Sequence, residues 1–243
     1  RTPAELSVNA PRIEVHDDAP ALATAVAGAL VSRLAAAQAV GRQPHVALTG
    51  GTIADAIHRE LAGLASSLDW SNVDFWWGDE RFVPRDSGDR NARAARAAFL
   101  DRVGVDPARV HEIGPSDEFD IVAAAAEAYG REIREHGSET FEVVMLGVGP
   151  DGHVASLFPG HPTLDVDDRV AVPVTDSPKP PPERVSLTLP ALNRTRATWL
   201  VVSGVEKADA VARALAGEDL PAARVGGTEE TVWFLDRAAA SSL

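Results

Sequence analysis

Residues 141–160 read FEVVMLGVGPDGHVASLFPG, and this segment indicates both the fold and the place of a site. Its first six residues form a largely apolar run, which is typical of a buried strand. The run leads directly into a turn with three glycines, and His153 follows at the start of a short helix expected over residues 154–158. Ligands of open α/β sheets bind beyond the carboxyl ends of the strands, so we expect a functional site at this turn.

His153 is suited to acid–base chemistry, because imidazole exchanges protons near neutral pH. A structural histidine packed beneath the short helix is the alternative interpretation. The six other histidines look like surface or strand-start residues, and only His161, in a loop beside a proline, is a rival. Asp151 either orients His153 or caps the short helix.

The rest of the chain alternates strand-like apolar runs with helical patterns. We expect helices over residues 19–39, 52–64, 91–103, 118–135 and 206–215. We expect strands over residues 46–48, 73–77, 111–113, 141–146, 170–174, 185–189, 198–202 and 231–235. This alternation predicts right-handed crossovers and a mostly parallel sheet flanked by helices. The chain shows no internal repeat and no domain linker, so we expect a single α/β domain over residues 1–243.

The composition argues against several classes of function. A net charge of −13 leaves no basic excess for nucleic acid, and an anionic substrate would need a local cationic pocket. The absence of cysteine excludes disulfides and thiolate metal sites and fits a cytoplasmic protein. The apolar run 19–37 is mostly alanine and looks too weak for a membrane span. Because the sequence opens at Arg1 rather than Met, we expect a few residues before it.

Two further motifs stand at expected strand ends. Residues 49–52, Thr-Gly-Gly-Thr, precede a helix whose free N–H groups can bind an anion; the alternative is an ordinary connection with Thr52 as the N-cap. Asp79, Glu80 and Arg81 could bind sugar hydroxyls and phosphate, or could form a solvated charge cluster. No histidine pair stands at ligand spacing with a carboxylate, so no metal site is expected.

Together these motifs resemble those of the 6-phosphogluconolactonase family. The resemblance rests on Thr-Gly-Gly-Thr at residues 49–52, Gly-Asp-Glu-Arg-Phe-Val-Pro at residues 78–84, and Leu-Gly-Val-Gly-Pro-Asp-Gly-His-Val-Ala-Ser-Leu-Phe-Pro at residues 146–159. Asn91, residues 176–190 and residues 203–208 also fit, so the likeness covers nearly the whole chain in order. Two positions depart from the common pattern: residues 52–54 are Thr-Ile-Ala rather than Ser-Thr-Pro, and Arg90 replaces a serine.

The resemblance implies a Rossmann-like α/β fold, shared with glucosamine-6-phosphate deaminases and ribose-5-phosphate isomerases. It implies an enzyme that hydrolyses 6-phospho-D-glucono-1,5-lactone to 6-phospho-D-gluconate in the oxidative pentose phosphate pathway. The expected partner is this small sugar phosphate lactone, with no nucleic acid and no membrane. The expected assembly is a monomer or a weak dimer in the cytoplasm, and neither a metal nor a redox cofactor is needed.

The resemblance also implies roles for the site residues. His153 would be the general base, with Asp151 and Arg81 as further catalytic residues. The substrate would be held by the glycine turn, the charged motif and two isolated cations, namely Thr49, Gly50, Gly51, Thr52, Asp79, Glu80, Arg81, Arg184 and Lys207. General-base catalysis contributes roughly 10²–10⁴-fold. Backbone N–H groups of residues 149–152 or Arg81 could stabilise the developing oxyanion.

Three other functions compete with this interpretation. An amino-sugar-phosphate deaminase or isomerase also carries Asp-Gly-His, but it needs an additional carboxylate, and this chain has no acid between His153 and Asp165. A sugar-phosphate sensor would carry a DNA-binding segment, whereas the residues before Val46 are rich in alanine and have only four cations, Arg1, Arg12, Arg33 and Arg42. A redox enzyme would need a dinucleotide fingerprint, which is absent from the sequence.

Overall fold

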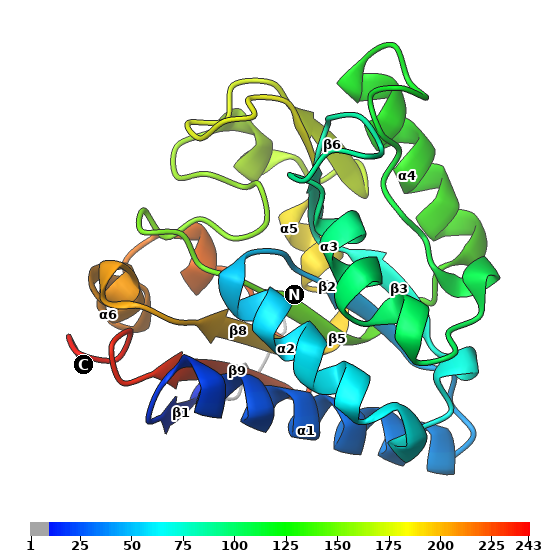
Figure 1. The fold of residues 1–243 in the computed structure, drawn as a ribbon. Coiled ribbons are helices and arrows are strands. Elements are labelled where there is room, and N and C mark those ends of the chain that lie inside the picture. Colours follow the sequence, from blue (N-terminus) through cyan, green and yellow to red (C-terminus); the bar gives the residue numbers. More distant parts are fainter. Residues whose placement is uncertain (1–9) are drawn as a thin grey trace, which may run out of the picture.

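Six parallel strands form the central sheet of the structure, a computed structural model that describes residues 10–243 (Figure 1). The strands stand in the order β1–β9–β8–β5–β2–β3, and every neighbouring pair is parallel. Their bounds are β1 Arg12–His16, β2 His45–Leu48, β3 Asp74–Trp77, β5 Phe141–Leu146, β8 Thr195–Val202 and β9 Glu230–Asp236. The predicted fold class, a mostly parallel sheet flanked by helices, is confirmed.

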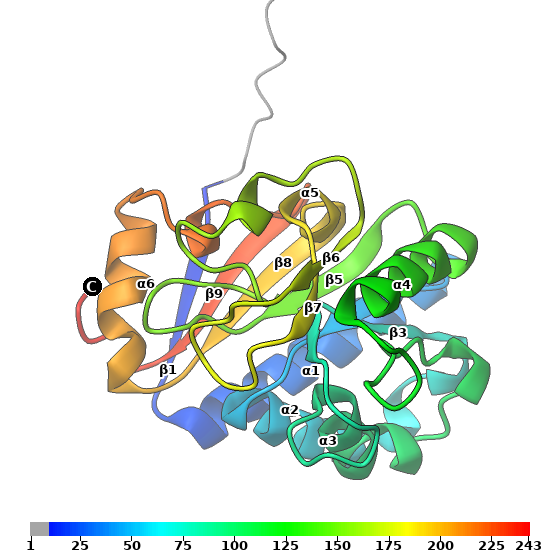
Figure 2. The same ribbon diagram turned by 90° about the horizontal axis from the view of Figure 1, so that it is seen from above.

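Helices cover both faces of this sheet. Their bounds are α1 Ala19–Ala39, α2 Thr52–Gly63, α3 Asn91–Ala98, α4 Val122–His136, α5 Leu189–Leu192 and α6 Ala208–Leu215. Figure 2 shows α1 and α2 along one face and α4 beyond the opposite face, as right-handed crossovers require when the chain moves both ways from β2. Short 3₁₀ turns occupy Ala65–Ser67, Trp70–Asn72, Leu100–Arg102, Pro107–Arg109, Pro162–Asp165, Val205–Lys207 and Pro221–Ala223.

The long helix α1 forms where the sequence predicts it. Asp18 accepts a hydrogen bond from the N–H of Ala21 at 2.9 Å and so caps the helix N-terminus. Leu22, Val26 and Leu30 recur at a spacing of four and are fully buried. By length and composition alone this helix could cross a membrane, contrary to the expectation from the sequence. Its buried face, however, packs into the same core as the central sheet.

A small antiparallel sheet lies beside the main one and positions the site. Its strands are β4 Asp79–Arg81, β7 Arg184–Leu187 and β6 Ala171–Val174, in the order β4–β7–β6. Arg81 stands opposite Arg184 in this pairing, although the two residues are far apart in sequence. The sequence predicts a loop at β4, because three charged residues are too few to show the alternation that marks a strand.

Two predicted elements are wrong. Residues 154–158 form no helix: Val154 and Leu157 make an isolated β-bridge, and Ala155 has a φ of 48°. The strand expected over residues 111–113 is reduced to a single bridge between Phe75 and Val110. Both segments are so short that local pattern cannot outweigh the tertiary contacts of their backbone.

Other boundaries shift by a few residues. Helix α4 begins at Val122 rather than residue 118, because the N–H groups of Glu118 and Phe119 are used in a turn on the carbonyl of Pro115. Helix α3 ends at Ala98, and a 3₁₀ turn replaces its expected last residues. Strand β1 was not predicted from the sequence; its largely exposed, mixed composition gives no clear strand pattern.

His58 is buried inside the domain, contrary to the expectation that the other histidines lie at surfaces or strand starts. It lies on α2, is 1% exposed, and stacks on Phe99 with ring centroids 6.0 Å apart. Neither ring nitrogen has a hydrogen-bond partner among the described residues. Burial lowers the pKa of His58 to about 4, so the ring is neutral at physiological pH.

Candidate active site

The carboxyl ends of β2 and β5 open into a cavity of 250 Å³. The chain runs from β2 to β3 on one side and returns to β5 on the other, and ligands bind at such a reversal of strand order. Most of the predicted site residues line this cavity, namely Thr49, Gly50, Gly51, Asp79, Arg81, His153, Arg184 and Lys207. Tertiary structure has therefore collected them from separate segments of the chain.

His153 and Asp151 form a hydrogen-bonded pair at this cavity. The imidazole Nδ1 lies 2.5 Å from Asp151 Oδ1, and the backbone N–H of His153 lies 3.3 Å from the same oxygen. Burial acts to raise the pKa of Asp151, but its hydrogen bond and charge interaction with His153 lower it to about 2. The ionised carboxylate can only accept, so Nδ1 carries a proton, and in the neutral ring Nε2 is then the acceptor nitrogen. The structure favours orientation of His153, rather than helix capping, as the role of Asp151.

The turn before His153 requires glycine. A Cβ built on Gly149 would lie 2.6 Å from Asp151 Oδ1 and still closer to His153 Nδ1. The N–H of Gly149 donates to the carbonyl of His153 at 2.9 Å, and the N–H of Gly152 donates to the carbonyl of Gly149 at 2.9 Å. The N–H groups of Gly149 and Gly152 are therefore used within the turn and are not free to stabilise an oxyanion, and Pro150 has no N–H.

The first turn of α2 has free N–H groups beside the cavity, whose lining contains the preceding Gly50 and Gly51. Gly51 is the N-cap, with a φ of 100°, and no side chain of the described residues caps this end. The alternative in which Thr52 is the N-cap is therefore wrong, because Thr52 is the first helical residue. At Gly50 a Cβ would overlap the side chain of Asn91, so this turn needs both glycines. Uncapped N–H groups at a helix N-terminus are an anion site.

The only two lysines of the chain, Lys179 and Lys207, line the same cavity. Neither makes an ion pair within residues 10–243, whereas most of the arginines there are paired. Burial and the charge of Lys179 lower the pKa of Lys207. Two unpaired ammonium groups that repel each other are stabilised by an anion placed between them.

Lys207 is held in place through β9. The hydroxyl of Ser203 donates to Asp236 Oδ2 at 2.6 Å, and the N–H of Gly204 donates to the same carboxylate at 3.1 Å. The N–H of Lys207 then donates to the carbonyl of Gly204 at 3.1 Å. Asp236 is thus a supporting residue that sequence reasoning did not identify.

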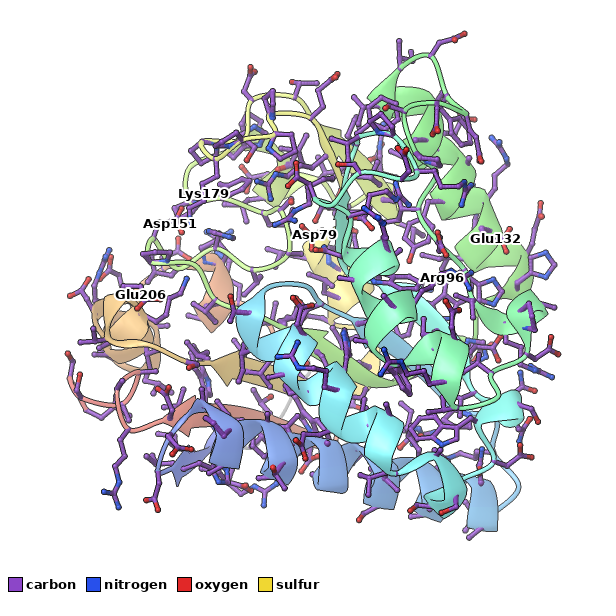
Figure 3. The ribbon with its side chains drawn as sticks, viewed as in Figure 1. Asp79, Arg96, Glu132, Asp151, Lys179 and Glu206 are labelled. Atoms are coloured by element: carbon purple, nitrogen blue, oxygen red, sulfur yellow. The ribbon has the colours of Figure 1, made fainter. Side chains whose placement is uncertain are left out.

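Arg184 shapes the loop that carries Lys179. Its Nε donates to the carbonyl of Pro181 at 3.2 Å, and its Nη2 donates to the carbonyl of Lys179 at 3.0 Å. The guanidinium carbon lies 5.8 Å from the ring centroid of Phe158, which also contacts the His153 ring at 4.6 Å between centroids. Arg184 therefore links the loop of Lys179 to the neighbourhood of the base. Figure 3 shows Lys179 and Asp151 on the same side of the molecule.

The charged motif of β4 divides between two sides of the strand, because successive side chains of a strand point in opposite directions. Asp79 and Arg81 line the cavity, whereas Glu80 is 1% exposed and lies outside it. Glu80 accepts hydrogen bonds from the N–H groups of Asn91 and Ala92, both at 2.8 Å, and so holds the start of α3. The structure therefore does not bring Glu80 to the substrate position predicted for it.

Asp79 and Arg81 are positioned differently within the cavity. Asp79 is buried, and its Oδ2 accepts a hydrogen bond from Ser156 at 2.6 Å. Arg81 donates from Nη1 to the carbonyl of Asp89 at 2.7 Å, while its buried Nε has no partner among the described residues. Arg81 therefore offers a donor that the protein itself leaves unused.

Besides Glu80 and Asp236, three further residues of the site were missed or misplaced by sequence reasoning. Thr52 borders a neighbouring chamber rather than this cavity. Lys179, in the Pro-rich segment, was not singled out, although its rarity as one of two lysines was a usable signal. Ser156 carries no such signal, since only the fold brings its hydroxyl to Asp79.

These features define the class of the protein: a Rossmann-like α/β protein with a cavity lined by cationic side chains and by a histidine that a carboxylate orients. The comparison with protein families agrees. The model for glucosamine-6-phosphate isomerases and 6-phosphogluconolactonase matches residues 17–233, and the chain belongs to this family.

Individual relatives support the assignment. The 6-phosphogluconolactonase of Streptomyces coelicolor is 45% identical over 248 residues, covering 96% of this chain and 95% of the relative. The crystal structure of 6-phosphogluconolactonase from Thermotoga maritima superposes with a TM-score of 0.81 at 29% identity, covering 93% and 99% of the two chains. A monomeric glucosamine-6-phosphate deaminase has a TM-score of 0.80 at 19% identity, covering 96% and 100%, a likeness that shows the fold alone.

Proposed function

We propose that this enzyme hydrolyses 6-phospho-D-glucono-1,5-lactone to 6-phospho-D-gluconate, in the oxidative pentose phosphate pathway, with His153 as general base. Hydrolysis of a phosphogluconolactone is the activity named for its relatives. One observation carries the mechanism: His153, which is hydrogen-bonded to Asp151, and two unpaired lysines line the same 250 Å³ cavity. A base and an anion site in one cavity suit a substrate with a reactive carbonyl at one end and a phosphate at the other.

The phosphate is placed at the N-terminus of α2, between Lys179 and Lys207. Backbone N–H groups and ammonium groups form charge-assisted hydrogen bonds with phosphate oxygens. Arg184 contributes by fixing the loop of Lys179, and its Nη1 is the donor left for the ligand. Binding at this remote end orients the lactone carbonyl toward His153, which converts binding energy into rate.

Ring opening then needs one water and one proton carrier. His153 Nε2 takes a proton from water as the oxygen attacks the lactone carbonyl carbon, and ionised Asp151 stabilises the resulting imidazolium. The imidazolium returns its proton to the ring oxygen as the carbon–oxygen bond breaks. Arg81 is the donor for the oxyanion, because its Nε has no partner within the described residues, whereas the N–H groups of Gly149 and Gly152 are already used.

The deaminase alternative needs acid and base groups beyond this pair. The cavity offers Asp79, whose Oδ2 is held by Ser156, and residues 154–164 contain no carboxylate. These facts favour lactone hydrolysis. We further propose one domain over residues 1–243, a monomer or weak dimer in the cytoplasm, and activity that depends on no metal or redox cofactor.

The test is opening of freshly generated lactone at neutral pH with a chelator present. We expect the wild type to accelerate the reaction and His153→Ala to lose most of this acceleration with little change in KM. His161→Ala is the matched control, since His161 hydrogen-bonds within its own loop to Thr163. A wild type that does not exceed the spontaneous rate, but releases ammonia from glucosamine 6-phosphate, would establish the deaminase instead.

A further inference from the structure

A second chamber of 740 Å³ adjoins the active-site cavity. It lies between the N-terminal parts of α1 and α2 and the carboxyl ends of β5 and β8. The two hollows share one wall, which contains Gly50, Gly51, Gly147 and Lys207. The proposed phosphate position is therefore a junction that can be reached from either side.

In the proposed function the lactone leaves this second chamber empty. The inference drawn below takes only the position of the phosphate from that proposed function. With the phosphate at the junction and the carbonyl at His153, the whole substrate occupies the smaller cavity. The second chamber has the volume of a ligand site, since such sites are about 300–1,000 Å³. A ligand with the same phosphate but a larger body could extend into it.

The walls and the rim of the chamber differ in chemistry. Pro20, Ala23, Ile53, Ala56 and Val202 make its walls aliphatic. Such walls suit the faces of a flat, weakly polar ring, which loses apolar surface to water when it is bound between them.

The rim carries both hydrogen-bond donors and acceptors, at Arg59, Glu60, Ser203 and Glu206. Arg59 is exposed and makes no ion pair within the described part of the chain, and Glu60 accepts a hydrogen bond from Thr24 at 3.2 Å. The Glu206 carboxylate lies against Gly204, and Figure 3 shows Glu206 beside α6, on the same side of the molecule as Asp151. Carboxylates at the rim accept from hydroxyl and amino groups and repel a second phosphate.

We propose that this chamber binds a nucleoside monophosphate, with its phosphate at the Gly51–Lys207 junction and its base between the aliphatic walls. A base has flat apolar faces and polar edges, and a ribose offers hydroxyl donors to Glu60 or Glu206. A plain alkyl phosphate matches the walls but leaves the rim unpaired. Because one phosphate position serves both ligands, the nucleotide competes with the lactone.

The experiment measures direct binding by calorimetry in the absence of lactone. Adenosine 5′-monophosphate is compared with ribose 5-phosphate, which lacks the base, and with hexyl phosphate, which lacks the polar edges. We expect the nucleotide to bind at least about tenfold tighter than either control, equivalent to about 1.4 kcal/mol. It should also raise the KM for lactone without changing kcat.

Ala56→Trp fills the chamber and should reduce nucleotide binding to the level of ribose 5-phosphate while the KM for lactone stays unchanged. Ala36→Trp, at an exposed position of α1, is the matched control and should bind as the wild type does. If Ala56→Trp fails to fold, Arg59→Glu at the rim should weaken the nucleotide and spare ribose 5-phosphate.

Equal binding of the nucleotide and ribose 5-phosphate to the wild type would overturn the proposal, and so would hexyl phosphate binding as tightly as the nucleotide. Neither result would touch lactone hydrolysis, which is measured separately. Conversely, a protein that binds the nucleotide but opens no lactone would disprove the proposed function alone.

Discussion

Replacing Gly149 by alanine tests whether the position of His153 controls the rate. Gly149 has no left-handed φ, so alanine can adopt its backbone conformation, and the effect comes from the added methyl group. That carbon would lie 2.6 Å from Asp151 Oδ1 and closer to His153 Nδ1. Non-bonded atoms prefer roughly 3.5–4.0 Å, so the pair must move by at least about 1 Å.

A displacement of about 1 Å at a catalytic group can cost on the order of 10²-fold in rate, which corresponds to about 2.7 kcal/mol of activation free energy. We therefore expect kcat for lactone opening to fall by this factor, with KM and the melting temperature little changed. Stopped-flow measurement of acid release in weak buffer gives both constants.

Gly147→Ala is the matched control for this variant. It lies in the same turn, but its added carbon would come no closer than 3.8 Å, to Thr49 Oγ1. We expect nearly wild-type kcat from it. Wild-type kcat in Gly149→Ala, or the same loss in both variants, would refute the argument that the imidazole position depends on this contact.

Four further predictions follow from the structure. Lys179→Ala and Lys207→Ala should each raise KM about tenfold or more with kcat largely kept, since each removes a charge-assisted contact; steady-state kinetics will show this, and an unchanged KM contradicts the phosphate assignment. Asp151→Asn should lower kcat by roughly 10²–10⁴-fold by releasing the imidazole orientation, which single-turnover rates can test against a merely binding defect. His58 has a pKa lowered to about 4 in the folded state, so the unfolded chain binds more protons below pH 6.5 and stability falls as the pH drops toward 4; His58→Phe should remove about 2 kcal/mol of this dependence between pH 8 and pH 5 in urea titrations. Glu80→Ala should lower the unfolding free energy by about 3 kcal/mol, because Arg90 loses a buried partner and α3 its cap; a melting temperature equal to that of the wild type would contradict it.

Much of the site was readable along the chain. The apolar run at Phe141–Leu146, with a glycine turn and His153 after it, predicts a strand that ends at a site, and the structure has the strand and places His153 at the cavity. The glycine turn at residues 50–51 also stands where the sequence placed it, before a helix. These features are local: hydrophobic runs of strand length and glycines at turns depend on neighbouring residues.

Other features depend on contacts between distant segments. Glu80 and Arg81 are adjacent charged residues that the sequence assigns to the same site. The three-residue strand β4 directs Glu80 toward α3 and Arg81 into the cavity. The helix expected after His153 does not form, because Val154 and Leu157 pair with each other in a tight β-bridge. The N–H of Ser156, between them, donates to the hydroxyl of Ser186 in the small sheet. No local pattern encodes these outcomes.

The sequence by itself determined the parallel α/β class, the order of most elements and the place of His153 after a strand end, because strand and helix periods and turn residues are properties of short segments. Only the tertiary structure decided which charges share the cavity. Lys179, Arg184 and Lys207 reach the α2 N-terminus because the small sheet and the crossover to α6 return three distant segments to one sheet edge. The interaction energy of these charges with one another and with an anion depends on their distance in space, which the order of residues does not specify.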